Sequence, residues 1–89
     1  MTRVRQMTGR TGRPVANQFL ITTPEGVYFQ SYKTVIAFRE DSGKTWLDRD
    51  HWDYSVTTGK YRNHFLGMNK AETQKAIEAG DIGLINLNQ

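Results

Sequence analysis

Four short segments rich in aromatic and β-branched residues constrain the fold of this chain most strongly. They span residues 17–23, 27–32, 34–39 and 44–48. Between the first two, residues 23–26 (Thr-Pro-Glu-Gly) are typical of a type I turn, with proline second and glycine fourth. Residues 40–43 (Glu-Asp-Ser-Gly) form a second turn sequence between the last two. The pattern predicts two hairpins that together make a four-stranded antiparallel meander.

Two short helices are expected after the strands. The first spans about 59–66, with hydroxyl caps at residues 57–58 and a glycine at position 67 to end it. The second spans 70–79 and begins at a capping-box-like pair, Asn69 and Glu72. The apolar segment 81–89 would add an edge strand. The sequence therefore predicts an α+β fold, an antiparallel four-stranded β-meander covered by two short C-terminal helices, with a candidate C-terminal edge strand.

The first 13 residues differ in charge from the rest of the chain. Their charged residues are all basic: Arg3, Arg5, Arg10 and Arg13. The formal charge of +3 for the whole chain therefore leaves −1 for residues 14–89. Because residues 1–13 show neither helical nor strand periodicity, we expect a flexible basic N-terminal arm there. Residues 14–89 are then one α+β domain, since 89 residues leave no room for a second core.

Composition removes several classes of protein. The chain has no cysteine, which excludes disulfides, thiolate metal sites and cysteine nucleophiles. No apolar stretch approaches the roughly 20 residues that a membrane-spanning helix needs, and the N-terminus lacks the apolar block of a secretory signal. We therefore expect an intracellular, cytoplasmic protein.

Asp48, Asp50, His51 and Asp53 come closest to a metal or acid-base cluster. An EF-hand loop needs oxygen ligands at alternate positions, a central glycine and a distant glutamate, and this spacing does not supply them. Aspartates in loops commonly stabilise turns and helix caps, so we interpret the cluster as a polar turn. Neither histidine and no serine has a sequence context typical of catalysis. We expect no enzymatic activity, no metal and no cofactor.

Basic and aromatic side chains give the strongest indication of function. Arginine can bind phosphate through two hydrogen bonds, and an aromatic ring can stack on a base. The candidate nucleic-acid-binding residues are Arg3, Arg5, Arg10, Arg13, Lys33, Lys60, Tyr61 and Arg62. His64, in the same stretch as the last three, is a further candidate for stacking. The alternative is that the arm only aids solubility and that residues 60–64 are a solvated helix face.

Three stretches resemble small phage and mobile-element proteins of unknown function. They run from Pro14 to Phe19, from Tyr28 to Tyr32 and from Trp52 to Leu66, and the likeness as a whole extends from about residue 11 to residues 87–88. The resemblance implies an accessory protein that binds a component of the host or of the element. It supplies no catalytic or binding residues that could be transferred to this chain.

Three functions are compatible with these observations. The slightly favoured one is a non-enzymatic accessory protein that binds nucleic acid through the arm and a Lys/Tyr/Arg face. The alternative is an inhibitor of a host defence or replication enzyme, comparable to an anti-CRISPR protein, with Tyr28, Tyr32 and Tyr54 at the interface, because tyrosine often anchors interfaces. A less favoured function is a sponge that sequesters a nucleotide signal.

Overall fold

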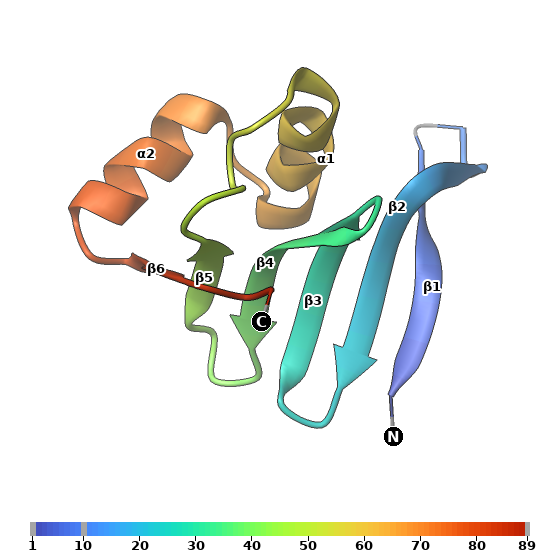
Figure 1. The fold of residues 1–89 in the computed structure, drawn as a ribbon, viewed down its shortest axis with the longest axis horizontal. Coiled ribbons are helices and arrows are strands. Elements are labelled where there is room, and N and C mark those ends of the chain that lie inside the picture. The colour runs from blue at the N-terminus through green and yellow to red at the C-terminus, as the bar shows by residue number, and fades with distance from the viewer. Residues whose placement is uncertain (1, 10, 89) are drawn as a thin grey trace.

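Six strands form one mixed sheet in the computed structural model, which describes residues 2–9 and 11–88. In chain order the strands are β1 (Arg3–Thr8), β2 (Pro14–Thr23), β3 (Gly26–Ser31), β4 (Thr34–Glu40), β5 (Thr45–Asp48) and β6 (Ile82–Ile85). The helices α1 (Val56–Leu66) and α2 (Lys70–Glu78) come between β5 and β6. The strands lie side by side in the order of the sequence (Figure 1), antiparallel up to β5, and β6 pairs parallel to β5.

The predicted four-stranded meander is wrong, although the fold is α+β. Its four segments correspond to β2, β3, β4 and β5, but the sheet continues at both edges through β1 and β6. The β5–α1–α2–β6 connection is long enough to return the chain in the same direction, which is what a parallel pair requires. The sheet is therefore six-stranded and mixed.

β1 occupies residues 3–8 of the 13-residue segment for which the sequence predicts a flexible arm. Val4 pairs with Ile21 and Arg5 with Leu20, so the strand is bonded to β2, with an irregularity in the pairing at Met7. Met7 is 3% exposed and belongs to the hydrophobic core. It is the one buried residue of β1, so the strand carries no alternating apolar pattern that sequence analysis could detect.

Both helices begin and end at recognisable caps. The side chain of Ser55 accepts a hydrogen bond from the Thr58 backbone N–H, so α1 starts three residues before the expected position. Gly67 ends α1 in the left-handed conformation, at φ 73°. The expected capping box between Asn69 and Glu72 is confirmed, with both reciprocal hydrogen bonds formed at the start of α2.

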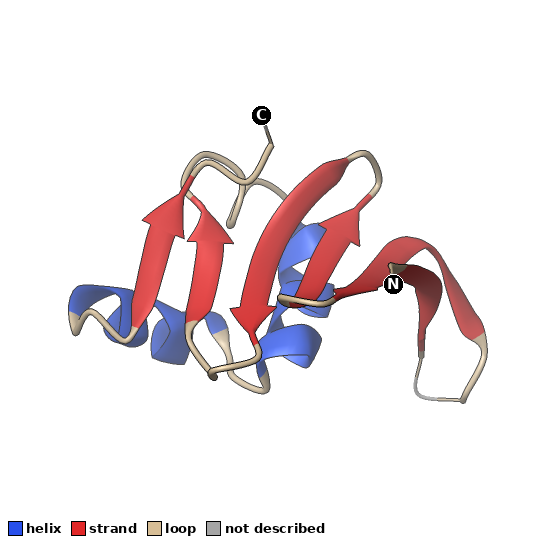
Figure 2. Cartoon of the chain, turned by 90° about the horizontal axis from the view of Figure 1, so that it is seen from below, coloured by secondary structure: helices blue, strands red, loops and turns tan. Residues whose placement is uncertain are grey.

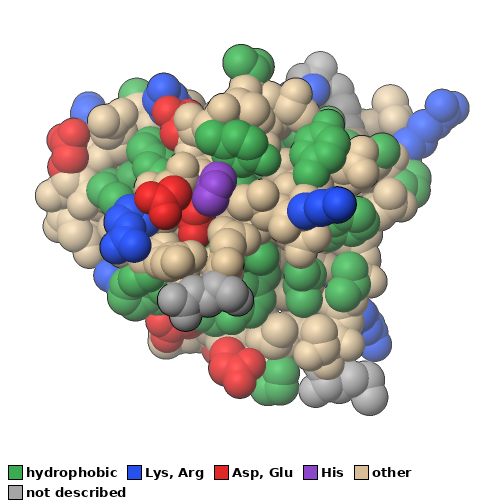
Figure 3. Space-filling model, in the orientation of Figure 1, with side chains coloured by type: hydrophobic (Ala, Val, Ile, Leu, Met, Phe, Trp, Pro, Cys, Tyr) green, Lys and Arg blue, Asp and Glu red, His purple; other side chains and the backbone are tan. Residues whose placement is uncertain are grey.

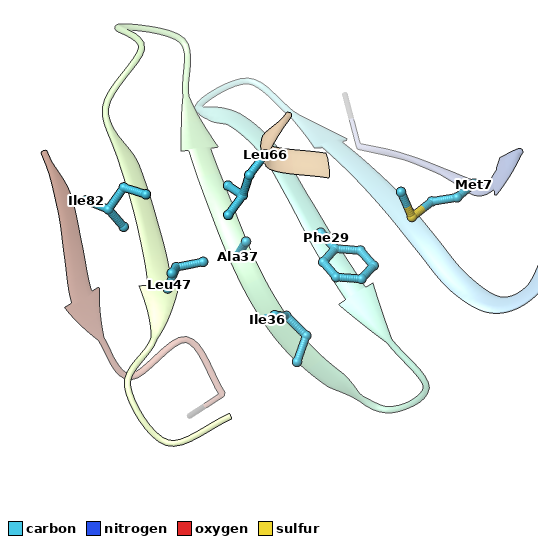
Figure 4. Close-up of a cluster of buried hydrophobic side chains, with 7 residues drawn as sticks. All are labelled: Met7, Phe29, Ile36, Ala37, Leu47, Leu66 and Ile82. Carbon is cyan, nitrogen blue, oxygen red and sulfur yellow. The ribbon is translucent and has the colours of Figure 1, made fainter. Parts of the chain in front are cut away.

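The two helices lie on the same side of the sheet, and the C-terminal end of the chain lies on the other (Figure 2). The buried core lies between the sheet and the helices. It consists of Met7, Phe29, Ile36, Ala37, Leu47, Leu66 and Ile82, which Figure 4 shows on the strands and beside the sheet. We call the side without helices the open face. Among the described residues, no helix is long and apolar enough to cross a membrane.

Candidate functional site

Two adjoining hollows lie between β1 and α1 and share Thr8 and His64 in their walls. One has a volume of about 370 Å³ and the other about 310 Å³. Together they form what we call the β1–α1 groove. It is lined by Arg5, Met7, Thr8, Gly9, Leu20, Val27, Arg39, Lys60, Tyr61, His64 and Phe65.

The groove combines positive charge with apolar surface. Arg5, Arg39 and Lys60 contribute cations to its walls, and no carboxylate is among its described lining residues. Two of the cations lie near aromatic rings, which favour a nearby positive charge. The guanidinium carbon of Arg39 is 4.9 Å from the ring centre of Phe65, and Lys60 Nζ is 5.4 Å from that of Tyr61. Such a surface is suited to an anion that also carries flat apolar groups.

Three elements distant in sequence hold these side chains together. Arg5 pairs with Leu20, and Leu20 pairs with the buried Phe29. Because directly paired residues point to the same side of a sheet, Arg5 points toward the helix side. Arg39, near the end of β4, donates a 2.9 Å hydrogen bond to the backbone carbonyl of Phe65 on α1. This bond fixes one wall of the groove against the sheet.

The groove unites three of the residues proposed from the sequence: Arg5, Lys60 and Tyr61. His64 joins them from the next turn of α1. Arg39 was missed, because a single arginine in an aromatic strand carries no signal of its own, and only the pairing of β3 with β4 and the packing of α1 bring it here.

The other basic candidates lie elsewhere. Arg3 is exposed on β1, Arg13 is exposed between β1 and β2, and Lys33 is exposed in the turn between β3 and β4. None of these three lines the groove. Arg10 lies outside the described residues.

Arg62 differs from the surface role expected from the sequence, because it is 1% exposed. Its Nη1 donates to the backbone carbonyl of Trp52 at 2.7 Å and to Asp53 at 3.2 Å, and its Nη2 donates to Asn63 at 2.8 Å. The guanidinium carbon also lies 5.2 Å from the ring centre of Trp52. Arg62 therefore holds the β5–α1 loop onto α1 and has no freedom to meet a ligand.

The three tyrosines proposed as a protein interface come from three segments of the fold. Tyr28 lies on β3 and stacks on Phe38, with ring centres 4.2 Å apart. Tyr32 is 50% exposed in the β3–β4 turn, whereas Tyr54 is 48% exposed in the loop before α1 and packs edge-on against His51. Tyr32 and Tyr54 are exposed, whereas Tyr28 is half-buried.

A larger, shallow hollow of about 660 Å³ lies where the two helices begin. Lys60, Arg62 and Lys70 are among its lining residues, together with Asp53. Asp53 contacts Arg62 and lies 2.7 Å from Lys70 Nζ, so it neutralises two of the three cations. Hydrogen bonding to Lys70 holds the pKa of Asp53 below its ordinary value, with a smaller contribution from Arg62 and in spite of partial burial. This hollow is less suited to an anion than the β1–α1 groove.

Asp48 uses its carboxylate to fasten the end of the chain. It is 1% exposed, and its two oxygens accept hydrogen bonds from the Leu87 backbone N–H at 2.8 Å and pair with His51 Nδ1 at 2.6 Å. Next to this, the Asn88 side chain bonds both backbone groups of Val35. Within residues 2–9 and 11–88, no group of three or more His, Asp or Glu side chains is placed to hold a metal ion.

Acid is expected to loosen this fastening. Burial alone would raise the pKa of Asp48, but hydrogen bonds from Leu87, His51 and Asn88 outweigh it and lower the pKa below the ordinary 3.8. The stabilisation is therefore complete above that value and is lost as the pH falls below it. Hydrogen exchange of the Leu87 amide should accelerate below pH 3.8 relative to amides in α2, and Asp48→Asn should remove this pH dependence. If the Leu87 amide of the native chain is protected equally above and below pH 3.8, relative to amides in α2, this role of Asp48 is contradicted.

Comparison with known proteins gives a family but no characterised relative. No curated protein and no solved structure matches the chain. A family model described as a family of unknown function (DUF8033) matches residues 2–80. The match includes β1, which precedes the region of likeness noted from the sequence, and extends to the end of α2. Because it covers most of the chain, this protein belongs to the family of unknown function DUF8033.

Proposed function

We propose that this protein binds single-stranded nucleic acid in the β1–α1 groove and that it is a non-enzymatic binding protein. The observation that carries the proposal is the convergence of Arg5, Arg39 and Lys60 on a groove without a carboxylate in its described lining. Proteins that bind single strands combine a positively charged groove along the backbone with aromatic side chains on which bases stack.

The aromatic component comes from α1. Tyr61 is half-buried and lines the groove beside Lys60, and His64 is exposed where the two hollows meet. Phosphates would lie against the cations, and a base would lie against one of these two rings. A single strand fits this arrangement better than a duplex, because only a single strand presents unstacked bases to such a wall.

The family resemblance supplies a setting for this proposal. In a phage or mobile element, a protein of this kind would act in the host cytoplasm on nucleic acid of the host or of the element. A host-protein target is the alternative, and it has less support, because Tyr28 is half-buried and stacks on Phe38.

Binding is tested by fluorescence anisotropy with labelled single-stranded DNA, single-stranded RNA and duplex DNA at two salt concentrations. We expect a complex with the single strands whose affinity falls as salt rises. Binding releases counterions from the phosphates, and this release is less favourable at high salt. Arg5→Gln and Lys60→Gln should each weaken binding and reduce the salt slope by about 0.7, the value for one phosphate contact on a single strand. Point substitutions suit this test better than removal of residues 1–13, which would remove β1 and uncover the core.

Lys75→Gln provides the matched control, because Lys75 is exposed on α2 and does not line the groove. It changes the net charge of the protein by the same amount and should leave the salt slope unchanged. The absence of a complex at low salt would refute nucleic-acid binding. Equal effects of all three substitutions would refute the groove as its location.

A further inference from the structure

The open face of the sheet carries a continuous row of apolar side chains across five strands. Strand pairing aligns Val4 with Ile21, Ile21 with Tyr28, Tyr28 with Phe38 and Phe38 with Trp46. Directly paired residues point to the same side of a sheet, so these side chains form one stripe. None of them belongs to the core between the sheet and the helices.

The row is not fully covered by the chain itself. Val4 is 59% exposed, and Ile21, Tyr28 and Trp46 are half-buried, whereas the rings of Tyr28 and Phe38 shield each other. Figure 3 looks onto this side of the molecule and shows hydrophobic side chains there, interspersed with polar and charged ones. A wide apolar stripe on a sheet face is typical of a surface that packs against another sheet.

Exposed side chains in the turns at the two ends of this face carry opposite charges. Glu25 and Asp41 lie in neighbouring turns at one end, where the Asp41 N–H donates to the Glu25 carbonyl at 3.0 Å. Lys44 lies beside this end, with its Nζ 5.1 Å from the ring centre of Trp46. Lys33 lies in the β3–β4 turn at the other end. The side chains of Glu25, Asp41 and Lys33 are exposed and form no ion pair within the described part of the chain.

This arrangement is complementary to itself under a two-fold rotation. Along β3 the midpoint between residues 25 and 33 is residue 29, next to Tyr28, and along β4 the midpoint between residues 33 and 41 is residue 37, next to Phe38. A two-fold axis across the strands at this level would place the acidic end of one chain against the Lys33 end of another. The same axis would pack the apolar rows together.

We infer that the open face binds the open face of a second copy of this chain, with the strands of the two sheets running in opposite directions. A standard interface takes about 800 Å² from each partner, about one seventh of the 5761 Å² surface of one chain. The molecule measures 34 × 29 Å across its broad side, so one face can supply this area. The β1–α1 groove lies on the helix side, so both grooves of a dimer would stay accessible. Dimerisation can therefore be measured without nucleic acid.

Molar mass in solution, measured by light scattering or sedimentation over a range of concentrations, tests the inference. The native chain should approach twice its 10.2 kDa mass as concentration rises. Ile21→Lys should leave a folded monomer, because it places a charge in the apolar row of both copies. Val56→Lys is the control: Val56 is 92% exposed on α1, away from this face, and its replacement should leave the dimer intact.

Charge reversal identifies the orientation. Lys33→Glu should weaken the dimer about tenfold or more, because it places like charges together at two symmetric positions. A chain that carries Lys33→Glu with Glu25→Lys and Asp41→Lys should regain dimerisation. A native chain that stays monomeric at every concentration would overturn the inference. A dimer that is insensitive to both Ile21→Lys and Lys33→Glu, in variants whose circular dichroism shows them folded, would overturn it as well.

Discussion

Replacing Arg62 with alanine is expected to lower the free energy of unfolding by about 3–5 kcal/mol, because a buried side chain and its hydrogen bonds are lost together. The substitution would leave the Trp52 carbonyl and the Asn63 side chain without the donor that now satisfies them. It would also remove the cation near the Trp52 ring and leave a void beneath α1. For a domain of this size, thermal unfolding should move down by about 12 °C or more.

Lys60→Ala is the matched control for Arg62, because Lys60 is a cation on the same helix but is exposed. Its stability change should stay within about 0.5 kcal/mol, as for most surface substitutions. Thermal and urea unfolding of the two variants provide the measurement. Similar small losses in both variants would show that Arg62 does not hold the β5–α1 loop as described.

Gly26→Ala is expected to be comparably destabilising for a different reason. A Cβ atom at this position would lie 2.1 Å from the Arg39 carbonyl oxygen and 2.9 Å from the Glu40 Cα. The residue also has φ 155°, which side-chain-bearing residues rarely adopt. Because both obstacles are backbone atoms of β4, the β2–β3 hairpin must shift away from its partner. We expect a loss of about 3 kcal/mol or more.

Gly43→Ala separates the two causes. Gly43 also has a positive φ, 98°, but an added Cβ there would meet no atom within 4 Å. Its cost should be conformational strain alone, about 1–2 kcal/mol. A loss for Gly26→Ala no larger than that for Gly43→Ala, measured by urea unfolding, would contradict the close approach between the hairpin and β4.

The central strands could be predicted from the sequence because each carries large apolar residues on at least one side. Turn sequences between them fixed the hairpins, and the Asn69–Glu72 pair fixed the start of α2. The two edge strands have weaker sequence signals. β1 buries only Met7, and the parallel pairing of β6 with β5 depends on where the two helices return the chain, which no local pattern records.

The groove could be predicted only in part. Lys60 and Arg62 are two residues apart on a helix, about 200° around its axis, so they cannot share a face, and the structure exposes the first and buries the second. The sequence identifies Arg5 as a candidate cation but predicts that it lies in a flexible arm. Arg39 required knowledge of which part of α1 packs over β4. The groove forms only where β1, β4 and α1 meet in the tertiary structure, and no local sequence pattern indicates that meeting.

A nuclear magnetic resonance titration of ¹⁵N-labelled protein with a single-stranded oligonucleotide tests the central claim most directly. Binding in the β1–α1 groove predicts that the largest shifts appear at Thr8, Lys60, Tyr61 and His64. The indole N–H of Trp46, on the open face, should keep its position. Shifts confined to the open face, or no shifts at low salt, would contradict the assignment of the groove as the nucleic-acid-binding site.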